Sequence, residues 1–185
     1  MEQVLHYLQS MARKKNSTVS HYASWPTAWG PVGAAGCDEG LVRFILPHYL
    51  PDQIDEVLAW EYPKAVKSDE PFEELIELTR AYFNAKPSDF TDIKCSLPSE
   101  TTFTGKALRA LREVPFGSTV SYRDLAMKIH LPDSARAIAT AMGKNPIPLI
   151  VPCHRVIYSS GKLGGFSAEG GTALKQKMLD LEAKS

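Results

Sequence analysis

The sequence predicts an α+β fold made of two domains, and three observations lead to this prediction. The N-terminal half contains β-rich stretches followed by two amphipathic helical patterns, whereas the C-terminal half is mostly helical. Residues 87–100, which contain two prolines and show no periodicity, separate the halves. The chain has 185 residues, enough for one medium domain or for two small domains that share an interface. We therefore expect an N-terminal α/β domain at residues 1–96, with its linker starting near residue 87, and a second domain at residues 97–185.

The composition is that of a folded globular chain and excludes several classes of protein. Hydrophobic residues make up 44% and charged residues 23% of the sequence. No apolar run approaches the roughly 18 residues that a membrane span needs, and the first residues lack the basic and apolar regions of a secretory signal. The three cysteines, Cys37, Cys95 and Cys153, are too few for a disulfide framework. We expect a cytoplasmic protein (nuclear in a eukaryote) with no membrane partner.

Charge is distributed unevenly along the chain although the formal net charge is zero. Residues 1–96 carry 9 basic and 14 acidic residues, while residues 97–185 carry 12 basic and 7 acidic residues. Such an asymmetry suggests that the second half meets a polyanion. Two solvated faces of opposite sign would produce the same pattern, so charge alone leaves both interpretations open.

The elements of the N-terminal half follow from its apolar spacing. Residues 4–15 show a helical pattern that ends in basic residues, as suits a helix C-terminus. Residues 25–35 and 41–46 are expected to be extended stretches of a β-hairpin, because a glycine-bounded polar turn joins them. Two helices are expected to follow, one opening at Pro51 and one running from Phe72 to Tyr82.

The C-terminal half has the outline of a helix-turn-helix. A helix over residues 106–114 is followed by a helix over residues 122–129 with Ser121 as its N-cap. After a short break at residues 130–132, Asp133 is the expected N-cap of a helix that runs to Gly143. A final helix is expected over residues 173–182.

Small residues crowd the second helix of this outline. Ile138 and Met142 are expected to face the core, whereas Ala137 and Ala141 would form a flat face. A flat face lets the backbone come close to a wide partner, although tight packing against another helix would also explain it.

Cys153 is the candidate nucleophile, because a thiolate is the best nucleophile a chain has at neutral pH. Prolines and apolar residues surround it and place it in a dry strand or turn. In an extended chain His154 would point away from Cys153, so it would act as a base through a bound water unless the backbone bends. Glu182 is the favoured carboxylate for orienting His154, with Glu169 and Asp180 as alternatives. A structural cysteine beside a satisfied histidine is the competing interpretation.

A glycine-rich segment, residues 158–171, follows the cysteine and offers backbone groups to a ligand. Phe166 could supply a stacking face and Ser167 a hydrogen bond, although a plain surface connection would also be rich in glycine.

The sequence resembles the O6-alkylguanine-DNA alkyltransferases, also called methylated-DNA–protein-cysteine S-methyltransferases. The resemblance rests on Pro152-Cys153-His154-Arg155-Val156 preceded by Asn145-Pro146-Ile147-Pro148, and it extends from about Phe103 to Glu182. The first 96 residues match in outline, chiefly at residues 29–32 and 40–42. The resemblance implies a ribonuclease-H-like N-terminal domain and a winged-helix C-terminal domain. It also implies DNA repair by stoichiometric, irreversible transfer of an alkyl group from O6 of a flipped-out guanine to a cysteine.

The resemblance also assigns roles to individual positions. Cys153 becomes the alkyl acceptor, His154 its water-mediated base and Glu182 the residue that orients His154, with Asn145 as a hinge and Tyr122 as a contact to the flipped base and its phosphate. Arg136 is implied to insert into the duplex, and the expected DNA-binding set is completed by Arg123, Ala135, Ala137 and Ser159. The expected substrate pocket consists of Val156, Phe166 and Ser167. The partner implied is double-stranded DNA containing O6-alkylguanine, bound through its minor groove by a monomer.

No cofactor is expected, and no metal either, because Cys37, Cys95 and the histidines lack the spacing of a metal site. Two rival functions remain open at this point. One is a protein that binds and flips the alkylated base without transfer. The other is a cysteine hydrolase or acyltransferase, which would turn over many times.

Overall fold

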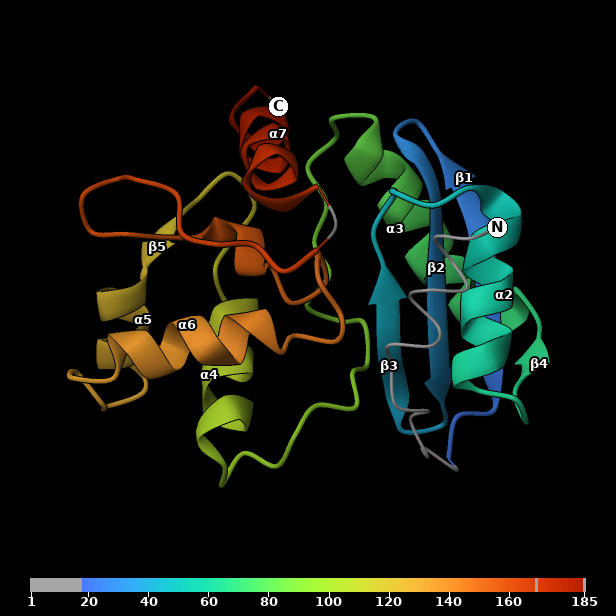
Figure 1. Cartoon of the computed structure of the whole chain (residues 1–185), viewed down its shortest axis with the longest axis horizontal. Helices are drawn as coiled ribbons and strands as arrows, with labels where there is room; N and C mark the ends of the chain where they lie inside the picture. Colours follow the sequence, from blue (N-terminus) through green and yellow to red (C-terminus); the bar gives the residue numbers. More distant parts are fainter. Residues whose placement is uncertain (1–17, 169, 185) are drawn as a thin grey trace.

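The N-terminal half of the molecule is built on a four-stranded sheet (Figure 1). The computed structural model describes residues 18–168 and 170–184. Its strands lie in the order β3-β2-β1-β4, all neighbours antiparallel except β1 and β4. Their bounds are β1 His21–Thr27, β2 Gly30–Cys37, β3 Gly40–Ile45 and β4 Val66–Lys67. The helical pattern expected at residues 4–15 lies outside the described residues.

The expectation that residues 25–35 form one extended stretch is wrong. β1 ends at Thr27 and β2 begins at Gly30, which has a φ of +121° that favours glycine. The hydroxyl of Thr27 donates a hydrogen bond of 2.6 Å to the carbonyl of Gly30 and closes this turn. The expected hairpin between residues 25–35 and 41–46 is present as the pair β2 and β3.

Helices cover both faces of the sheet. The expected helices appear as α2 (Pro51–Glu61) and α3 (Glu73–Phe83), the latter entered through a one-turn helix, η1 (Glu70–Phe72). α2 packs on the face that includes Ala35 and Ile45. α3 packs on the opposite face, where the indole Nε1 of Trp25 donates a 2.9 Å hydrogen bond to the Thr79 hydroxyl. This bond fixes α3 to the sheet.

The helix-turn-helix outline is present, with shifted boundaries. Its helices are α4 (Phe103–Arg112), α5 (Tyr122–Lys128) and α6 (Ala135–Gly143). α4 begins and ends earlier than expected, because the Thr102 hydroxyl caps it by accepting from the Gly105 N–H at 3.0 Å. Ser121 caps α5 as predicted, accepting from the Asp124 N–H. The expectation that Asp133 caps the next helix is wrong, since helical geometry begins at Ala135 and Ser134 holds the cap position.

The flat face expected on α6 differs from the one observed. Ala137 is exposed, but Ala141 is buried beside Ile138 and Met142. These three residues follow the spacing i, i+3, i+4 and form the stripe that packs on α4 and α5. The exposed small side chains of α6 are therefore those of Ala137, Ala139 and Thr140.

The segment that carries Cys153 lies between a two-stranded sheet and the last helix. β5 (Val120–Ser121) pairs in parallel with β6 (Val156–Ile157), and a one-turn helix, η2 (Cys153–Arg155), leads directly into β6. α7 (Gly171–Ala183) covers this segment and agrees with the helix expected at residues 173–182. Cys153 thus lies in a tight turn, one of the two conformations that the sequence allowed.

The two halves are joined along the edge of the N-terminal sheet. The connection from residues 84 to 102 is irregular, as expected, and runs beside β3, where Leu41 exchanges backbone hydrogen bonds with Lys94 and Ser96. The N–H of Phe44 donates to the carbonyl of Pro146 at 3.0 Å, immediately beside Asn145. One hydrophobic cluster contains buried residues from both halves. Within the described residues, no helix is long and apolar enough to cross a membrane.

Candidate functional site

Cys153 is a buried thiol held in a defined position. Its side chain belongs to the core and is 5% exposed. The Nδ2 of Asn145 donates hydrogen bonds to the Cys153 Sγ, at 3.2 Å, and to the carbonyl of Val151, at 2.7 Å. The Oδ1 of Asn145 accepts from the Ile147 N–H at 3.2 Å. Asn145 therefore ties the chain that leaves α6 to the turn that carries the thiol.

The resting state of this thiol is protonated. Burial raises the pKa of Cys153 and outweighs the hydrogen bond from Asn145 and the charge of Lys175, which both lower it. A thiol in this state needs a base before it can act as a nucleophile.

His154 is the neighbouring base, and it is fully buried, with 0% exposure. Its Nε2 lies 2.6 Å from the Oε1 of Glu182. Because a carboxylate can accept but not donate, Nε2 carries the proton and Nδ1 keeps a free lone pair. The buried Nδ1 has no hydrogen-bond partner among the described residues. Burial lowers the pKa of His154 despite the favourable contact with Glu182, so this imidazole is neutral and able to accept a proton.

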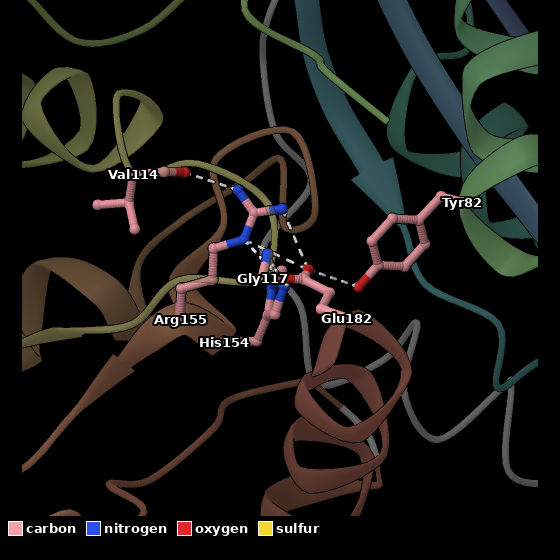
Figure 2. Close-up of polar contacts among 6 residues, drawn as sticks. All are labelled: Tyr82, Val114, Gly117, His154, Arg155 and Glu182. Carbon is pink, nitrogen blue, oxygen red and sulfur yellow. Dashed lines mark hydrogen bonds and ion pairs between the residues drawn. The ribbon is translucent and has the colours of Figure 1, made fainter. Parts of the chain in front are cut away.

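Glu182 is the carboxylate that the structure brings to His154, and Figure 2 shows its surroundings. Arg155, the residue after His154, forms an ion pair with this carboxylate, with its Nε 2.9 Å from Oε2 and its Nη2 3.1 Å from Oε1. The N–H of Gly117 donates to Oε2 at 3.0 Å, and the hydroxyl of Tyr82 donates to Oε1 at 2.9 Å. Burial raises the pKa of Glu182, but the contacts with His154 and Arg155 outweigh it and lower the pKa to about 2. Glu182 is therefore a buried, fully ionised anchor.

The other carboxylates considered for this role do not take it. Asp180 lies on the exposed side of α7, where it accepts from Gln176 at 2.8 Å. Glu169 lies outside the described residues.

Lys175 is a residue of the site that the sequence reasoning missed. It is 0% exposed, and its Nζ donates a 2.5 Å hydrogen bond to the carbonyl of Val156 and lies 6.0 Å from the ring centre of Tyr122. Burial lowers the pKa of this ammonium, and the charge of Cys153 raises it. Helical spacing could have predicted its burial. Lys175, Met178 and Glu182 are three and four residues apart and share the buried stripe of α7.

A groove beside α5 and α6 gathers most of the residues expected to bind DNA. It has a volume of about 580 Å³ and is bordered by two exposed arginines, Arg123 and Arg136. Tyr122, Ala135 and Ser159 also border it, whereas Ala137 is exposed on α6 outside the lining. Tyr158 is an addition that the sequence reasoning missed. It is half exposed, with its ring 5.3 Å from that of Tyr122.

A second cleft opens directly onto the nucleophile. It has a volume of about 560 Å³, and Cys153, Phe166 and Ser167 line it together with Asn145 and Pro148. Part of its wall comes from the N-terminal half, at and after the end of β3, through residues 43–46, 48 and 49. The side chain of Val156 is buried in the core and does not line this cleft. The structure thus places two of the three expected pocket residues beside Cys153.

The other two cysteines, Cys37 and Cys95, are not part of the site around Cys153. Cys37 and Cys95 are half-buried and free, and burial raises the pKa of Cys95 to about 11. Among residues 18–168 and 170–184, no group of three or more His, Cys, Asp or Glu side chains is placed to hold a metal ion.

Comparisons with known proteins agree on one family. Residues 102–184 match the family model described as "6-O-methylguanine DNA methyltransferase, DNA binding domain". A methylated-DNA–protein-cysteine methyltransferase from Methanosarcina acetivorans is 36% identical over 164 residues, which cover 88% of this chain and 97% of the relative. An inducible enzyme of the same name from Bacillus subtilis is 37% identical over 141 residues, covering 71% and 74% of the two chains. The structure also resembles that of Mycobacterium tuberculosis OGT in complex with DNA, with a TM-score of 0.72 and 32% identity, covering 89% of this chain and 93% of the other.

Proposed function

The chain belongs to the methylated-DNA–protein-cysteine methyltransferase family, and from this membership we propose how its own residues carry the reaction. The protein repairs DNA by direct reversal: it transfers an alkyl group irreversibly from O6 of guanine to one of its cysteines, once per molecule. Its partner is DNA. The observation that carries the assignment of residues is the buried Cys153 thiol at the wall of a cleft, next to a neutral His154 whose Nε2 is held by Glu182.

The transfer is an SN2 displacement at the alkyl carbon. The Sγ of Cys153 forms a bond to that carbon, the bond from the carbon to O6 breaks, and the electron pair leaves with the guanine. The thiol proton passes through a water molecule to the Nδ1 of His154. The resulting imidazolium returns a proton through water to the departing guanine anion, so both end neutral. The product is a thioether, so the acceptor is consumed, and the thiol serves without a cofactor.

Binding of the flipped guanine falls to the residues around the cleft. Phe166 lines it and Ser167 offers a hydrogen bond to the base edge, while Val156 supports the pocket from the core and Tyr122 contacts the flipped nucleotide. Asn145 is the hinge between α6 and the reactive turn, in agreement with its three hydrogen bonds. Flipping costs a few kcal/mol of base stacking, which the pocket contacts must offset.

The DNA is held in its minor groove by the helix-turn-helix. The half-buried Ala135 and the exposed Ala137 at the start of α6 are small, so the helix can approach the duplex closely. Arg136 inserts where the flipped base has left the stack, and Arg123 and Ser159 border the same groove as Arg136.

The same proposal covers the finer description of the molecule. The two domains are a ribonuclease-H-like domain at residues 1–96 and a winged-helix domain at residues 97–185. The matching family model spans residues 102–184 and supports the position of the second domain. We further propose that the protein acts as a monomer and that it works in the cytoplasm, or in the nucleus of a eukaryote.

Intact-protein mass spectrometry with peptide mapping tests the proposal directly. The protein is mixed with duplex DNA that contains one O6-methylguanine. We expect one added methyl group on Cys153, saturating at one per molecule. Cys153→Ser should abolish the added mass and retain DNA binding, whereas the matched control Cys95→Ser should be methylated like the wild type.

Other outcomes would contradict the proposal in distinguishable ways. Tight DNA binding without a mass change would support a protein that flips the lesion without transfer. Repeated turnover on small esters would support a cysteine hydrolase. Methylation at Cys37 or Cys95 would overturn the assignment of Cys153.

A further inference from the structure

The carboxylate of Glu182 receives a hydrogen bond from the other half of the molecule. The donor is the hydroxyl of Tyr82, on the last turn of α3, 2.9 Å from Oε1. The same oxygen lies 2.6 Å from the Nε2 of His154. Figure 2 shows Tyr82 reaching this oxygen from a different element than His154 and Arg155. One oxygen of the proposed relay is thus shared between the two halves.

Tyr82 is fixed in place by close packing around its ring. Its side chain is fully buried, and its ring packs edge-on against Phe83, Phe90 and Phe116 at centroid distances of 5.2–6.2 Å. α3 itself is fixed to the sheet by the bond between Trp25 and Thr79. The position of the Tyr82 hydroxyl is therefore set by α3, Phe83 and Phe90 of the N-terminal half, with Phe116 of the C-terminal half closing the packing around the ring.

We infer that Tyr82 is a positioning residue for alkyl transfer: its hydroxyl fixes the Glu182 carboxylate that orients His154, and so makes the chemistry depend on the N-terminal half. The inference rests on the proposed roles of Cys153, His154 and Glu182. Tyr82 itself does not touch the reacting atoms, since its hydroxyl donates to Glu182.

The hydroxyl acts on both the geometry and the charge of the carboxylate. With Tyr82 and His154 both donating to Oε1, and Arg155 and Gly117 donating to Oε2, rotation of the carboxylate breaks at least one hydrogen bond. Donation from Tyr82 also withdraws negative charge from the oxygen that faces His154. Without it, Oε1 would interact more strongly with a protonated imidazole, and the pKa of His154 would rise.

The charged and titratable groups around His154 are few and can be accounted for. Glu182 and Lys175 act on it from α7, and Cys153 and Arg155 flank it in η2. The ring of Tyr82, on α3, lies edge-on with its centre 6.5 Å from that of the imidazole. Apart from the acceptor Cys153, Tyr82 is the group that a single-atom change can remove without leaving an unpaired charge.

Tyr82→Phe is therefore the test, and single-turnover transfer from an O6-methylguanine duplex is the assay. Loss of one hydrogen bond to a charged group should slow transfer roughly tenfold. The dissociation constant for the same duplex should stay unchanged, and the acid limb of the pH–rate profile should move to higher pH. Tyr62→Phe is the matched control, because Tyr62 is also a buried tyrosine beside a carboxylate, Glu61, but lies in the cluster around α2.

Repeating the substitution in a His154→Gln variant distinguishes a positioning role of Tyr82 from a role in folding. In His154→Gln, adding Tyr82→Phe should have no further effect on the rate, because the pathway from the hydroxyl to the thiol is already broken. Equal rates and pH profiles for Tyr82→Phe and the wild type would overturn the inference. A slower variant with an unshifted pH profile, or with the same loss in the His154→Gln background, would show a structural role and overturn it as well. Absence of methyl transfer by the wild type would instead contradict the proposed function.

Discussion

Burial keeps both reacting groups neutral at rest, because it raises the pKa of Cys153 and lowers that of His154. A neutral thiol beside a neutral imidazole protects the cysteine from unwanted alkylation and oxidation until a substrate fills the cleft. The charges in the site are instead carried by side chains that never react, namely Glu182, Arg155 and Lys175. Substituting Lys175 or Glu182 should therefore change the reactivity of Cys153 or the stability of the fold.

Lys175→Met should weaken the nucleophile. Removing the buried ammonium takes away a positive charge that lowers the pKa of Cys153, so the thiolate becomes less accessible. We expect roughly tenfold slower alkylation by iodoacetamide and by the lesion duplex at neutral pH, equivalent to one pKa unit. Lys184→Met, which changes an exposed lysine of the chain beyond α7, should react at the wild-type rate. Unchanged iodoacetamide kinetics in Lys175→Met would refute this role.

Glu182 should make the fold sensitive to acid. Its folded-state pKa of about 2 lies below the ordinary value of 4.5, so its ionisation stabilises the fold above pH 4.5 and this stabilisation is lost as the pH falls toward 2. The loss amounts to roughly 3 kcal/mol by linkage. Urea unfolding at a series of pH values should show a steep fall over this range in the wild type.

The matched variant for this titration is Glu182→Gln. It should be less stable than the wild type at pH 7, because it leaves Arg155 buried and unpaired, but its stability should depend less on pH between 4.5 and 2. Parallel curves for the two proteins would contradict the assignment of the acid sensitivity to Glu182.

Among the elements, two close contacts shape the site: α7 packs against η2, and the glycine-rich segment packs against α5. The stripe of α7 brings both Lys175 and Glu182 to η2. The glycine-rich segment passes over Tyr122 at Gly164, where an added Cβ would lie 2.1 Å from the tyrosine hydroxyl and 2.7 Å from its ring. The backbone of Gly164 lies so close to Tyr122 that no side chain fits between them.

Gly164→Ala should therefore displace Tyr122. We expect an overpacking cost of about 1–3 kcal/mol in the free energy of unfolding and slower transfer from the lesion duplex, because the proposed contact to the flipped nucleotide moves. Gly165→Ala is the control next to it, since a Cβ there meets no atom within 4 Å. If both variants behave alike, the close packing at Gly164 has no functional importance.

For the whole molecule, the uneven charge has a measurable consequence. The C-terminal half carries the excess of basic residues and also the groove between Arg123 and Arg136, while the N-terminal half is acidic. In Figure 1 the N-terminal sheet and α2 lie on the opposite side of the molecule from α5 and α6, and the edge strand β3 is tied to the segment before Cys153. This arrangement favours DNA binding through one face of the protein.

Affinity for duplex DNA should fall linearly with the logarithm of the salt concentration, because phosphate contacts release counterions. Arg123→Ala should weaken binding to all sequences and make this slope shallower by about one. Arg80→Ala, an exposed arginine on α3 in the acidic half, should leave the slope unchanged. A slope that both variants share with the wild type would place the phosphate contacts elsewhere.

Local sequence properties were sufficient to predict much of the molecule. The amphipathic spacing of α2, α3 and α7, the cap at Ser121 and the proline-flanked Cys153 are written in neighbouring residues, and the ordered motifs from Phe103 to Glu182 led to the family. Boundaries that depend on one hydrogen bond or one glycine were less accurate. Gly30 split an apparent single strand in two, and the cap of α6 lay one residue beyond the expected Asp133.

Which residues meet across long distances in the chain depended on tertiary packing. The carboxylate of Glu182 contacts donors 28 and 100 residues away, His154 and Tyr82, and no local pattern encodes the second of these contacts. Lys175 is polar by composition yet fully buried, and Ala141 is small yet belongs to the core, because neighbouring helices decide which face of an element meets solvent. Identity and chemistry are thus local properties of the sequence, whereas burial, the resulting pKa values and the contribution of the N-terminal half arise when distant segments pack together.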